Sequence, residues 1–307
     1  MTHMGRQSTS GQQSSTRPRP RNRASAGAMR LGEWAFPSTP VDREVLHAEP
    51  TGAATQDASH RPPLLFVHGL AHGAWCWAES WLPRAADAGW SAHAVSVRAH
   101  GASGGRDRRR RTRLSDYEHD VLQEAVRLPR PPVVVAHSLG CVVASRVAER
   151  YPFAAVVLLT PVGVDHAVDL VVHTVGRAPG HVARMSTGLP VHLTEADLFA
   201  GLSPATAAEY VSRLDPEPPL VQLQLLLRRP PGPAVQNPPV LVYGAELDAL
   251  VPASGVERTA RFYSTNARWL PGIGHDVMLD KGNEAVLDRV LLDLSGALAG
   301  RDGPDAA

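Results

Sequence analysis

Eight residues near the middle of the chain read Val133-Val134-Val135-Ala136-His137-Ser138-Leu139-Gly140. The three valines form a short apolar run, which is typical of a strand buried on both faces of a sheet. A helical stretch follows at once, so Ser138 is expected on a tight turn between strand and helix. Such a turn is strained and close-packed, which explains why small residues flank the serine. Unless the serine is there by chance, its hydroxyl projects above the edge of the sheet and is available as a nucleophile.

Strands and helices alternate on both sides of this turn. We expect strands at residues 44–48, 64–67, 91–97, 133–135, 154–159, 240–243 and 267–270. Helices are expected at 75–88, 117–128, 139–150, 252–262 and 284–298. A strand–helix alternation at this spacing predicts an α/β fold with a mostly parallel sheet flanked by helices.

The alternation stops in residues 165–235. Helical stretches are expected there at 195–202, 204–213 and 220–228, with no convincing strand. We therefore predict a helical lid inserted between two strands of one core, which is formed by residues 29–164 and 236–300. The apolar side chains of this lid either line an acyl pocket or only pack the lid onto the core.

The first 28 residues are rich in Ser, Gln, Arg, Pro and Gly. A segment of this composition buries too little apolar surface to offset the entropy lost on ordering. We predict a disordered basic tail over residues 1–28.

A serine hydroxyl needs a base, and the base needs a carboxylate that orients it. Asp248 follows the predicted strand 240–243, and His275 follows the predicted strand 267–270. Both positions lie at the carboxyl ends of strands, where open α/β sheets bind ligands. Sites with a serine on such a strand-to-helix turn have the chain order serine, acid, histidine, and Ser138, Asp248 and His275 follow it. We predict that these three residues form a catalytic triad.

Three other carboxylates compete with Asp248 for the role of triad acid. Asp165 follows the predicted strand 154–159, and Glu246 lies two residues before Asp248. Asp276 adjoins the predicted base and is expected to point away from it. A Ser–Lys pair would have to use Lys281, which is the only lysine of the chain.

Acyl transfer also needs two fixed amides that stabilise the negative charge on the substrate oxygen. The amide of Leu139 follows the nucleophile and begins a helix, whose dipole favours negative charge. The second amide is expected from the loop after strand 64–67, and we assign it to Leu70. His68 is then expected to hold this loop.

Composition and charge exclude several classes of protein. The net charge of +1 lacks the basic excess of a nucleic-acid binder, and no apolar run is long enough to cross a membrane. The N-terminus has no apolar segment typical of a secretory signal, so we expect a cytoplasmic protein. Cys76 and Cys141 are too few for a disulfide framework and are expected in the core.

Two further features are given non-catalytic interpretations. His68 and His72 are four residues apart, but no Glu lies between them, so we expect no metal there. Six arginines lie within residues 106–113, and we expect a solvated loop, although such a loop also attracts anionic lipid or phosphate. Ser115 and Glu118 have the spacing of a capping box, which makes Ser115 the expected N-cap of the next helix.

The chain resembles the serine-dependent α/β-hydrolase superfamily, and within it the bacterial lysophospholipase-like/esterase group. The resemblance spans roughly residues 40–298. It is carried by Phe66-Val67-His68-Gly69, Ala71-His72-Gly73-Ala74-Trp75-Cys76-Trp77, His100-Gly101-Ala102-Ser103, Ala136–Gly140, Asp248 with Pro252, and Gly274-His275-Asp276. One departure is Ala99, which stands where members of the group have Gly before the residue equivalent to His100.

The resemblance implies the α/β-hydrolase fold and hydrolysis of a small carboxylic ester, with no cofactor, no metal and no nucleic-acid partner. Three alternatives on the same fold stay open: a thioesterase, an acyltransferase or a lyase. Residues 72–77 are also similar to plant esterases and hydroxynitrile lyases, which keeps lyase chemistry among these alternatives. A fourth alternative is a hydrolase-fold protein that binds a ligand without turnover.

Overall fold

A computed structural model of the chain describes residues 40–51, 60–164 and 168–300. The predicted tail over residues 1–28 and the competing carboxylate Asp165 lie outside these described residues. Within them, no helix combines the length and the apolar character needed to span a membrane.

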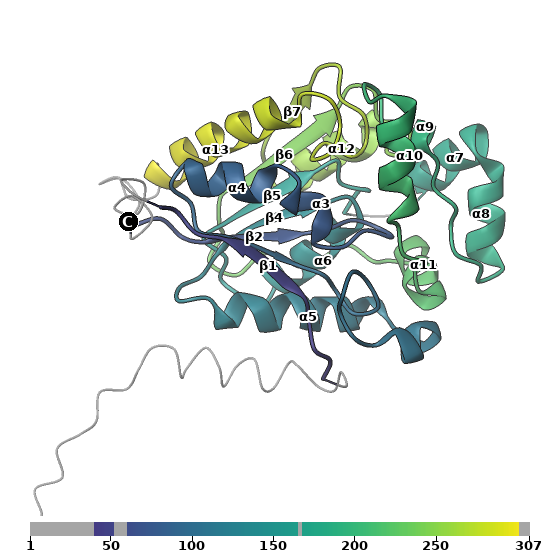
Figure 1. The fold of residues 1–307 in the computed structure, drawn as a ribbon, viewed down its shortest axis with the longest axis horizontal. Coiled ribbons are helices and arrows are strands. Elements are labelled where there is room, and N and C mark those ends of the chain that lie inside the picture. Colours follow the sequence, from purple (N-terminus) through teal and green to yellow (C-terminus); the bar gives the residue numbers. More distant parts are fainter. Residues whose placement is uncertain (1–39, 52–59, 165–167, 301–307) are drawn as a thin grey trace, which may run out of the picture. The chain divides into compact units, whose positions relative to one another are not determined.

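The described chain forms a seven-stranded sheet in the order β1-β3-β2-β4-β5-β6-β7 (Figure 1). The strands are β1 (Val45–Ala48), β2 (Leu64–Val67), β3 (Ala92–Val95), β4 (Val133–His137), β5 (Ala155–Leu159), β6 (Val240–Ala245) and β7 (Ala267–Leu270). The edge strand β1 is antiparallel to β3, and every other pair is parallel. The predicted α/β fold with a mostly parallel sheet is therefore confirmed.

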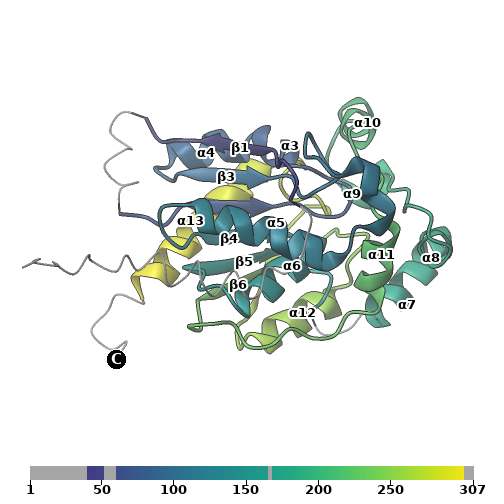
Figure 2. The same cartoon turned by 90° about the horizontal axis from the view of Figure 1, so that it is seen from below.

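Helices cover both faces of the sheet, as Figures 1 and 2 show. One face carries α3 (Trp75–Ala78), α4 (Trp81–Asp87) and α13 (Asn283–Ala299). The other carries α5 (Leu114–Arg127), α6 (Leu139–Ala148) and α12 (Ala253–Phe262). A sheet covered on both sides has no polar face, which explains the continuous apolar runs of its central strands.

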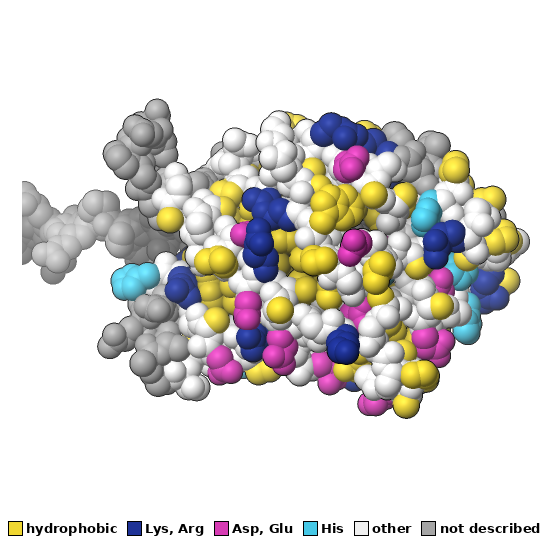
Figure 3. Space-filling view, turned by 90° about the horizontal axis from the view of Figure 1, so that it is seen from above, with side chains coloured by type: hydrophobic (Ala, Val, Ile, Leu, Met, Phe, Trp, Pro, Cys, Tyr) yellow, Lys and Arg dark blue, Asp and Glu magenta, His cyan; other side chains and the backbone are white. Residues whose placement is uncertain are grey.

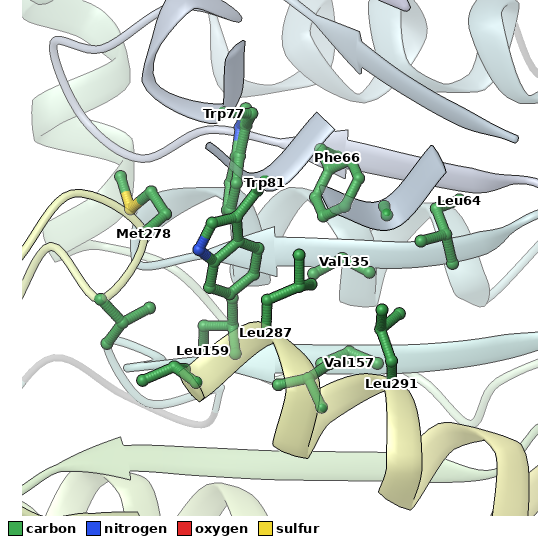
Figure 4. Close-up of a cluster of buried hydrophobic side chains, with 14 of the residues drawn as sticks. Leu64, Phe66, Trp77, Trp81, Val135, Val157, Leu159, Met278, Leu287 and Leu291 are labelled. Carbon is green, nitrogen blue, oxygen red and sulfur yellow. The ribbon is translucent and has the colours of Figure 1, made fainter. Parts of the chain in front are cut away.

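The core under α4 and α13 is built from alternating strand residues (Figure 4). Phe66, Val135 and Val157 are partners in register on three neighbouring strands, and they point to the same face. They pack against Trp81 of α4 and Leu287 of α13, which are both buried. Cys76 and Cys141 are buried and free, as expected from the sequence.

The helix predicted over residues 75–88 is two helices, α3 and α4. Pro83 explains the break: it has no N–H to donate to the carbonyl of Glu79, and its ring would collide with that carbonyl. Ser80 leaves the helical conformation with φ −146°, and α4 begins at Trp81. Pro83 thereby falls in the first turn of α4, where its missing N–H costs nothing.

The expectation that Ser115 is an N-cap is wrong. Helix α5 begins at Leu114, so Ser115 lies inside its first turn and Arg113 is the N-cap residue. The Asp116 carboxylate accepts a hydrogen bond from the Arg113 amide at 2.8 Å. Glu118 instead contacts Arg146 of α6.

Residues between β5 and β6 contain five helices within the described part of the chain. They are α7 (Val168–Arg177), α8 (Pro179–Ser186), α9 (Glu195–Leu198), α10 (Pro204–Ser212) and α11 (Pro219–Leu226). The sequence pattern named the last three but not α7 and α8. Residues Arg106–Arg111, in the arginine-rich stretch, form a short 3₁₀ helix, η1, with no buried side chain.

Candidate active site

Ser138 lies between the last residue of β4 and the first residue of α6. Its backbone has φ +51° and ψ −115°, a strained conformation for a residue with a side chain. Only glycine fits at Gly140, because a Cβ there would lie 2.6 Å from the carbonyl oxygen of His68. The expected strained, close-packed turn is therefore present, and the Ser138 side chain sits at its apex.

Two loops bring His275 and Asp248 to this serine. The Nε2 atom of His275 lies 3.0 Å from Ser138 Oγ, and its Nδ1 atom lies 2.8 Å from Asp248 Oδ2. The second carboxylate oxygen of Asp248 accepts the amides of Leu250 and Val251, both at 2.8 Å. Because those two amides fix the carboxylate, Asp248 can hold one orientation of the imidazole.

The environment of His275 makes it a stronger base than an exposed histidine. Burial alone would lower its pKa, but the charge and hydrogen bond of Asp248 outweigh burial, and the pKa is raised above its ordinary value of 6.5. A neutral His275 with a proton on Nδ1 donates to Asp248 and presents a free lone pair on Nε2 to the serine hydroxyl.

The competing carboxylates have other partners. Glu246 accepts the amide of Gly272 at 2.9 Å. Asp276 forms its side-chain hydrogen bond with His72 Nε2, at 2.9 Å. Lys281 is exposed. Of Asp248, Glu246 and Asp276, which all lie in the described residues, Asp248 is the one hydrogen-bonded to the His275 ring.

The two amides expected to bind the substrate oxygen come from loops beside Ser138. Leu139 is the first residue of α6, so its N–H has no partner within the helix. Leu70 lies in the loop after β2, and its carbonyl accepts a hydrogen bond from His72 Nδ1 at 2.9 Å. His68 donates from Nδ1 to the carbonyl of Gly69 and accepts the amide of Val97 on Nε2.

Sequence reasoning missed a buried polar cluster close to His275. His72 is held between the Leu70 carbonyl and the Asp276 carboxylate, so both of its ring nitrogens donate. His137 Nε2 donates to the backbone carbonyl of His275 at 2.9 Å. Burial, and then the nearby His275, lower the pKa of His137 to about 3, so its ring is neutral. The sequence signal was a histidine directly before the serine and an aspartate directly after the base, but neither pattern names a partner.

One group of side chains in the described ranges could share a metal ion: His137, His275 and Asp276, with ligand atoms within 4.8 Å of one another. Both ring nitrogens of His275 already bind Ser138 and Asp248. A metal at this point would have to displace one of those contacts. We assign no metal to the site, and His68 and His72 do not form a pair because they face different partners.

A pocket opens above Ser138 and His275. Its polar lining residues, besides Ser138 and His275, are His72, His137, Thr174, His181 and Asp276. Its walls are almost wholly apolar and come largely from the helices between β5 and β6: Leu70, Leu139, Val162, Leu170, Val171, Val182, Met185, Val191, Leu193, Leu198, Leu225, Leu226, Leu250 and Val251. Some residues between β5 and β6 therefore line the pocket, whereas Phe199 and Leu214 pack against Ala71 and its neighbours, and Leu223 and Leu227 are exposed.

Solved structures with a similar fold are α/β hydrolases of several kinds. A soluble variant of monoglyceride lipase from Saccharomyces cerevisiae is 16% identical, with a TM-score of 0.65, 85% of this chain covered and 92% of that one. A carboxylesterase of Nitrososphaera gargenis is 16% identical, with a TM-score of 0.60, 86% of this chain covered and 97% of that one. A bromoperoxidase from Bacillus anthracis is 14% identical, with a TM-score of 0.59 and coverage of 84% and 96%.

These identities establish the fold and not the reaction. No curated protein matches the sequence. The family described as "Alpha/beta hydrolase family" matches residues 64–289, which include Ser138, Asp248 and His275. Because that match covers well over half of the chain, this protein belongs to the alpha/beta hydrolase family.

Proposed function

We propose that this protein is a serine hydrolase that cleaves a carboxylic ester with an apolar acyl or alcohol part. One observation carries the proposal: Ser138 Oγ lies 3.0 Å from His275 Nε2, and His275 Nδ1 lies 2.8 Å from Asp248. Both distances are within the range that proton transfer and imidazole orientation require.

In the first half of the reaction, Ser138 Oγ bonds to the ester carbonyl carbon while His275 Nε2 takes the hydroxyl proton. The carbonyl oxygen becomes negative and is stabilised by the amides of Leu70 and Leu139. The bond between the carbonyl carbon and the alcohol oxygen then breaks. His275 gives its proton to the leaving oxygen, and an acyl group stays on Ser138.

In the second half, water replaces the alcohol. His275 takes a proton from the water, whose oxygen bonds to the acyl carbon, and the bond to Ser138 Oγ breaks. The proton returns to Ser138, and the carboxylic acid leaves. The two half-reactions need no cofactor, because each proton moves between the serine, the histidine, the substrate and the water.

The pocket supports a substrate with an apolar part. Polar groups lie beside Ser138, and apart from Thr174 and His181 the rest of the lining consists of leucine, valine and methionine side chains. Apolar walls with a few convergent polar groups are typical of sites for small organic ligands. The lid helices supply much of this lining, which favours the acyl-pocket interpretation of their apolar face.

The test is hydrolysis of p-nitrophenyl esters of increasing acyl length by the wild type and by Ser138→Ala, with acyl thioesters assayed in parallel. We expect ester hydrolysis that falls by about 10³-fold or more in the variant, since the nucleophile is lost. A fluorophosphonate probe should label the wild type and not the variant. Equal ester hydrolysis by the two proteins would refute Ser138 as nucleophile. Hydrolysis of thioesters but not of esters would mean that the substrate is a thioester.

A further inference from the structure

The segment Asp215-Pro216-Glu217, between α10 and α11, forms hydrogen bonds with one residue of the loop after β2. The Ala71 amide donates to Glu217 Oε2 at 2.7 Å, and the Ala71 carbonyl accepts the Asp215 amide at 2.7 Å. Both backbone polar groups of Ala71 are therefore bound by the lid rather than by the core. Ala71 directly follows Leu70, whose amide is one of the two proposed to stabilise the substrate oxygen.

The Glu217 carboxylate is fixed from the core side as well. The residue is 1% exposed, and Tyr117 of α5 donates its hydroxyl to Oε1 at 2.7 Å. His100 Nε2 lies 3.2 Å from Oε2. Burial, followed by the charge of Glu217, raises the pKa of Tyr117 well above its ordinary value, so the tyrosine stays a protonated donor. A buried carboxylate needs hydrogen-bond donors, and the Tyr117 hydroxyl and the Ala71 amide supply them here and fix where it points.

These contacts determine the orientation of one peptide group. In the peptide that joins Leu70 to Ala71, the carbonyl oxygen accepts from His72 and the N–H donates to Glu217. Ala71 has φ +67°, a left-handed conformation that is unfavourable for alanine and has to be held by its surroundings. Because the peptide is planar, holding it in place limits how the adjoining Leu70 amide can turn.

The same segment is anchored at a second loop. Asp215 Oδ2 accepts the amide of Gly101 at 2.8 Å, and its Oδ1 accepts from the Arg106 guanidinium at 2.5 Å. Ala71 also belongs to a small apolar cluster with Leu193 and Leu198 of the lid. Moving the segment away would leave the buried Glu217 carboxylate without the Ala71 amide and would release the strained residue.

We propose that Glu217 is a positioning residue that sets the geometry of the loop carrying the Leu70 amide, so that this part of the lid is a fixed component of the active site and not a free cover. The inference rests on the proposed function, in which the Leu70 amide stabilises the substrate oxygen. Glu217 is expected to affect the stability of the transition state and not the binding of the substrate, since it is not among the residues that line the pocket.

The experiment compares Glu217→Met, which removes the acceptor at similar length, with Glu217→Gln, which keeps one acceptor oxygen. We expect kcat for a p-nitrophenyl ester to fall by about 10- to 100-fold in Glu217→Met with KM within about threefold, since losing an oxyanion donor outright costs about 10²–10³. Glu217→Gln should keep most of the wild-type kcat. A kcat unchanged in Glu217→Met, or an equal loss in both variants, would overturn the proposal.

The matched control is Asp120→Asn in α5. Asp120 is also a fully buried carboxylate that accepts a backbone amide, that of Arg98, but it does not bind the loop after β2. We expect this variant to lose thermal stability while its kcat stays within about threefold of wild type. A loss of kcat in Asp120→Asn as large as in Glu217→Met would mean that general destabilisation explains both, which contradicts a positioning role.

A readout without turnover separates this inference from the proposed function. Amide hydrogen exchange at Ala71 should be at least about tenfold faster in Glu217→Met, because its acceptor is gone. If Glu217→Met does not fold, Glu217→Gln is expected to give a smaller acceleration in the same direction. Unchanged exchange at Ala71 would overturn the inference even if the wild type hydrolyses esters. Faster exchange at Ala71 would support the hydrogen bond between Glu217 and Ala71 even if the wild type does not hydrolyse esters.

Discussion

His72 and Asp276 form a buried pair, with His72 Nε2 2.9 Å from Asp276 Oδ2 across 204 residues of sequence. The pair joins the loop after β2 to the loop after β7, and those loops carry Leu70 and His275. Burial alone would lower the pKa of His72, but Asp276 outweighs it and the pKa is raised. Burial alone would raise the pKa of Asp276, but His72 outweighs it and the pKa is lowered. Both shifts favour the charged forms of the pair, and the pair connects two parts of the site.

Asp276→Asn should destabilise the fold strongly. Removing one partner of a buried charged pair costs about 3–5 kcal/mol, since the other charge is left without compensation. Urea unfolding at pH 6 measures the loss. The control is Asp288→Asn, because Asp288 is exposed and pairs with the exposed Arg84, so its loss should stay within about 1 kcal/mol. Equal losses in the two variants would contradict the importance of the buried pair.

The same pair predicts how stability depends on pH. His72 has a raised pKa in the folded state, so its contribution is complete below 6.5 and is lost as the pH rises through the folded value. Asp276 has a lowered pKa, so its contribution is complete above 3.8 and is lost as the pH falls through the folded value. We expect the part of the unfolding free energy that Asp276→Asn removes to be largest between these ordinary values, near pH 4–6. A difference that grows steadily above pH 8 would contradict this assignment.

The acid limb of the activity profile should lie above pH 6.5. His275 must be neutral to accept the serine proton, and the Asp248 carboxylate raises its pKa despite burial. Asp248→Asn should lower kcat by about 10⁴-fold and move the limb to lower pH, since the charge that raises the pKa is gone. The measurement is kcat/KM against pH for both proteins. An acid limb that is the same in both would argue against Asp248 as the partner of His275.

Leu225→Trp should shift the preference of the enzyme towards shorter acyl chains. Leu225 is 3% exposed and lines the pocket from α11, so a larger ring there removes space. We expect kcat/KM to fall by about tenfold or more for long esters and much less for short ones, in keeping with 1–3 kcal/mol for overpacking. Leu223→Trp is the matched control, because Leu223 is exposed on the same helix and is not part of the lining. An identical chain-length profile for both variants would show that the substrate lies elsewhere.

Gly69→Ala and Gly180→Ala should have opposite effects on stability. A Cβ at Gly69 would lie 2.7 Å from His137 Nδ1 and 3.1 Å from Ser138 Cβ, so the loop has to shift, at about 1–3 kcal/mol. A Cβ at Gly180, within helix α8, has nothing within 4 Å. Alanine there should stabilise by up to about 1 kcal/mol. Thermal unfolding of both variants tests this, and we expect ester hydrolysis to fall only in Gly69→Ala.

Local sequence was enough to place the elements that carry the site. Apolar runs such as Val133–Val135 are strands because their composition suits a surface buried on both sides, and this holds wherever the run ends up in the fold. Ser138, Asp248 and His275 each follow a strand of the parallel part of the sheet, and parallel strands end at one edge of the sheet. The prediction of one helix over residues 75–88 is wrong because of Pro83. The proline is visible in the sequence, but the apolar pattern around it favoured a continuous helix.

The sequence by itself determined the order of the strands along the chain and the positions of Ser138, Asp248 and His275 after three of them. Only the tertiary structure decided that Asp276 binds His72 and that Glu217 binds Ala71. Periodicity describes neighbours within one helix or strand, whereas these partners are 204 and 146 residues apart. A buried carboxylate must find donors, but which donors it finds depends on how distant segments pack, and no local pattern encodes that choice.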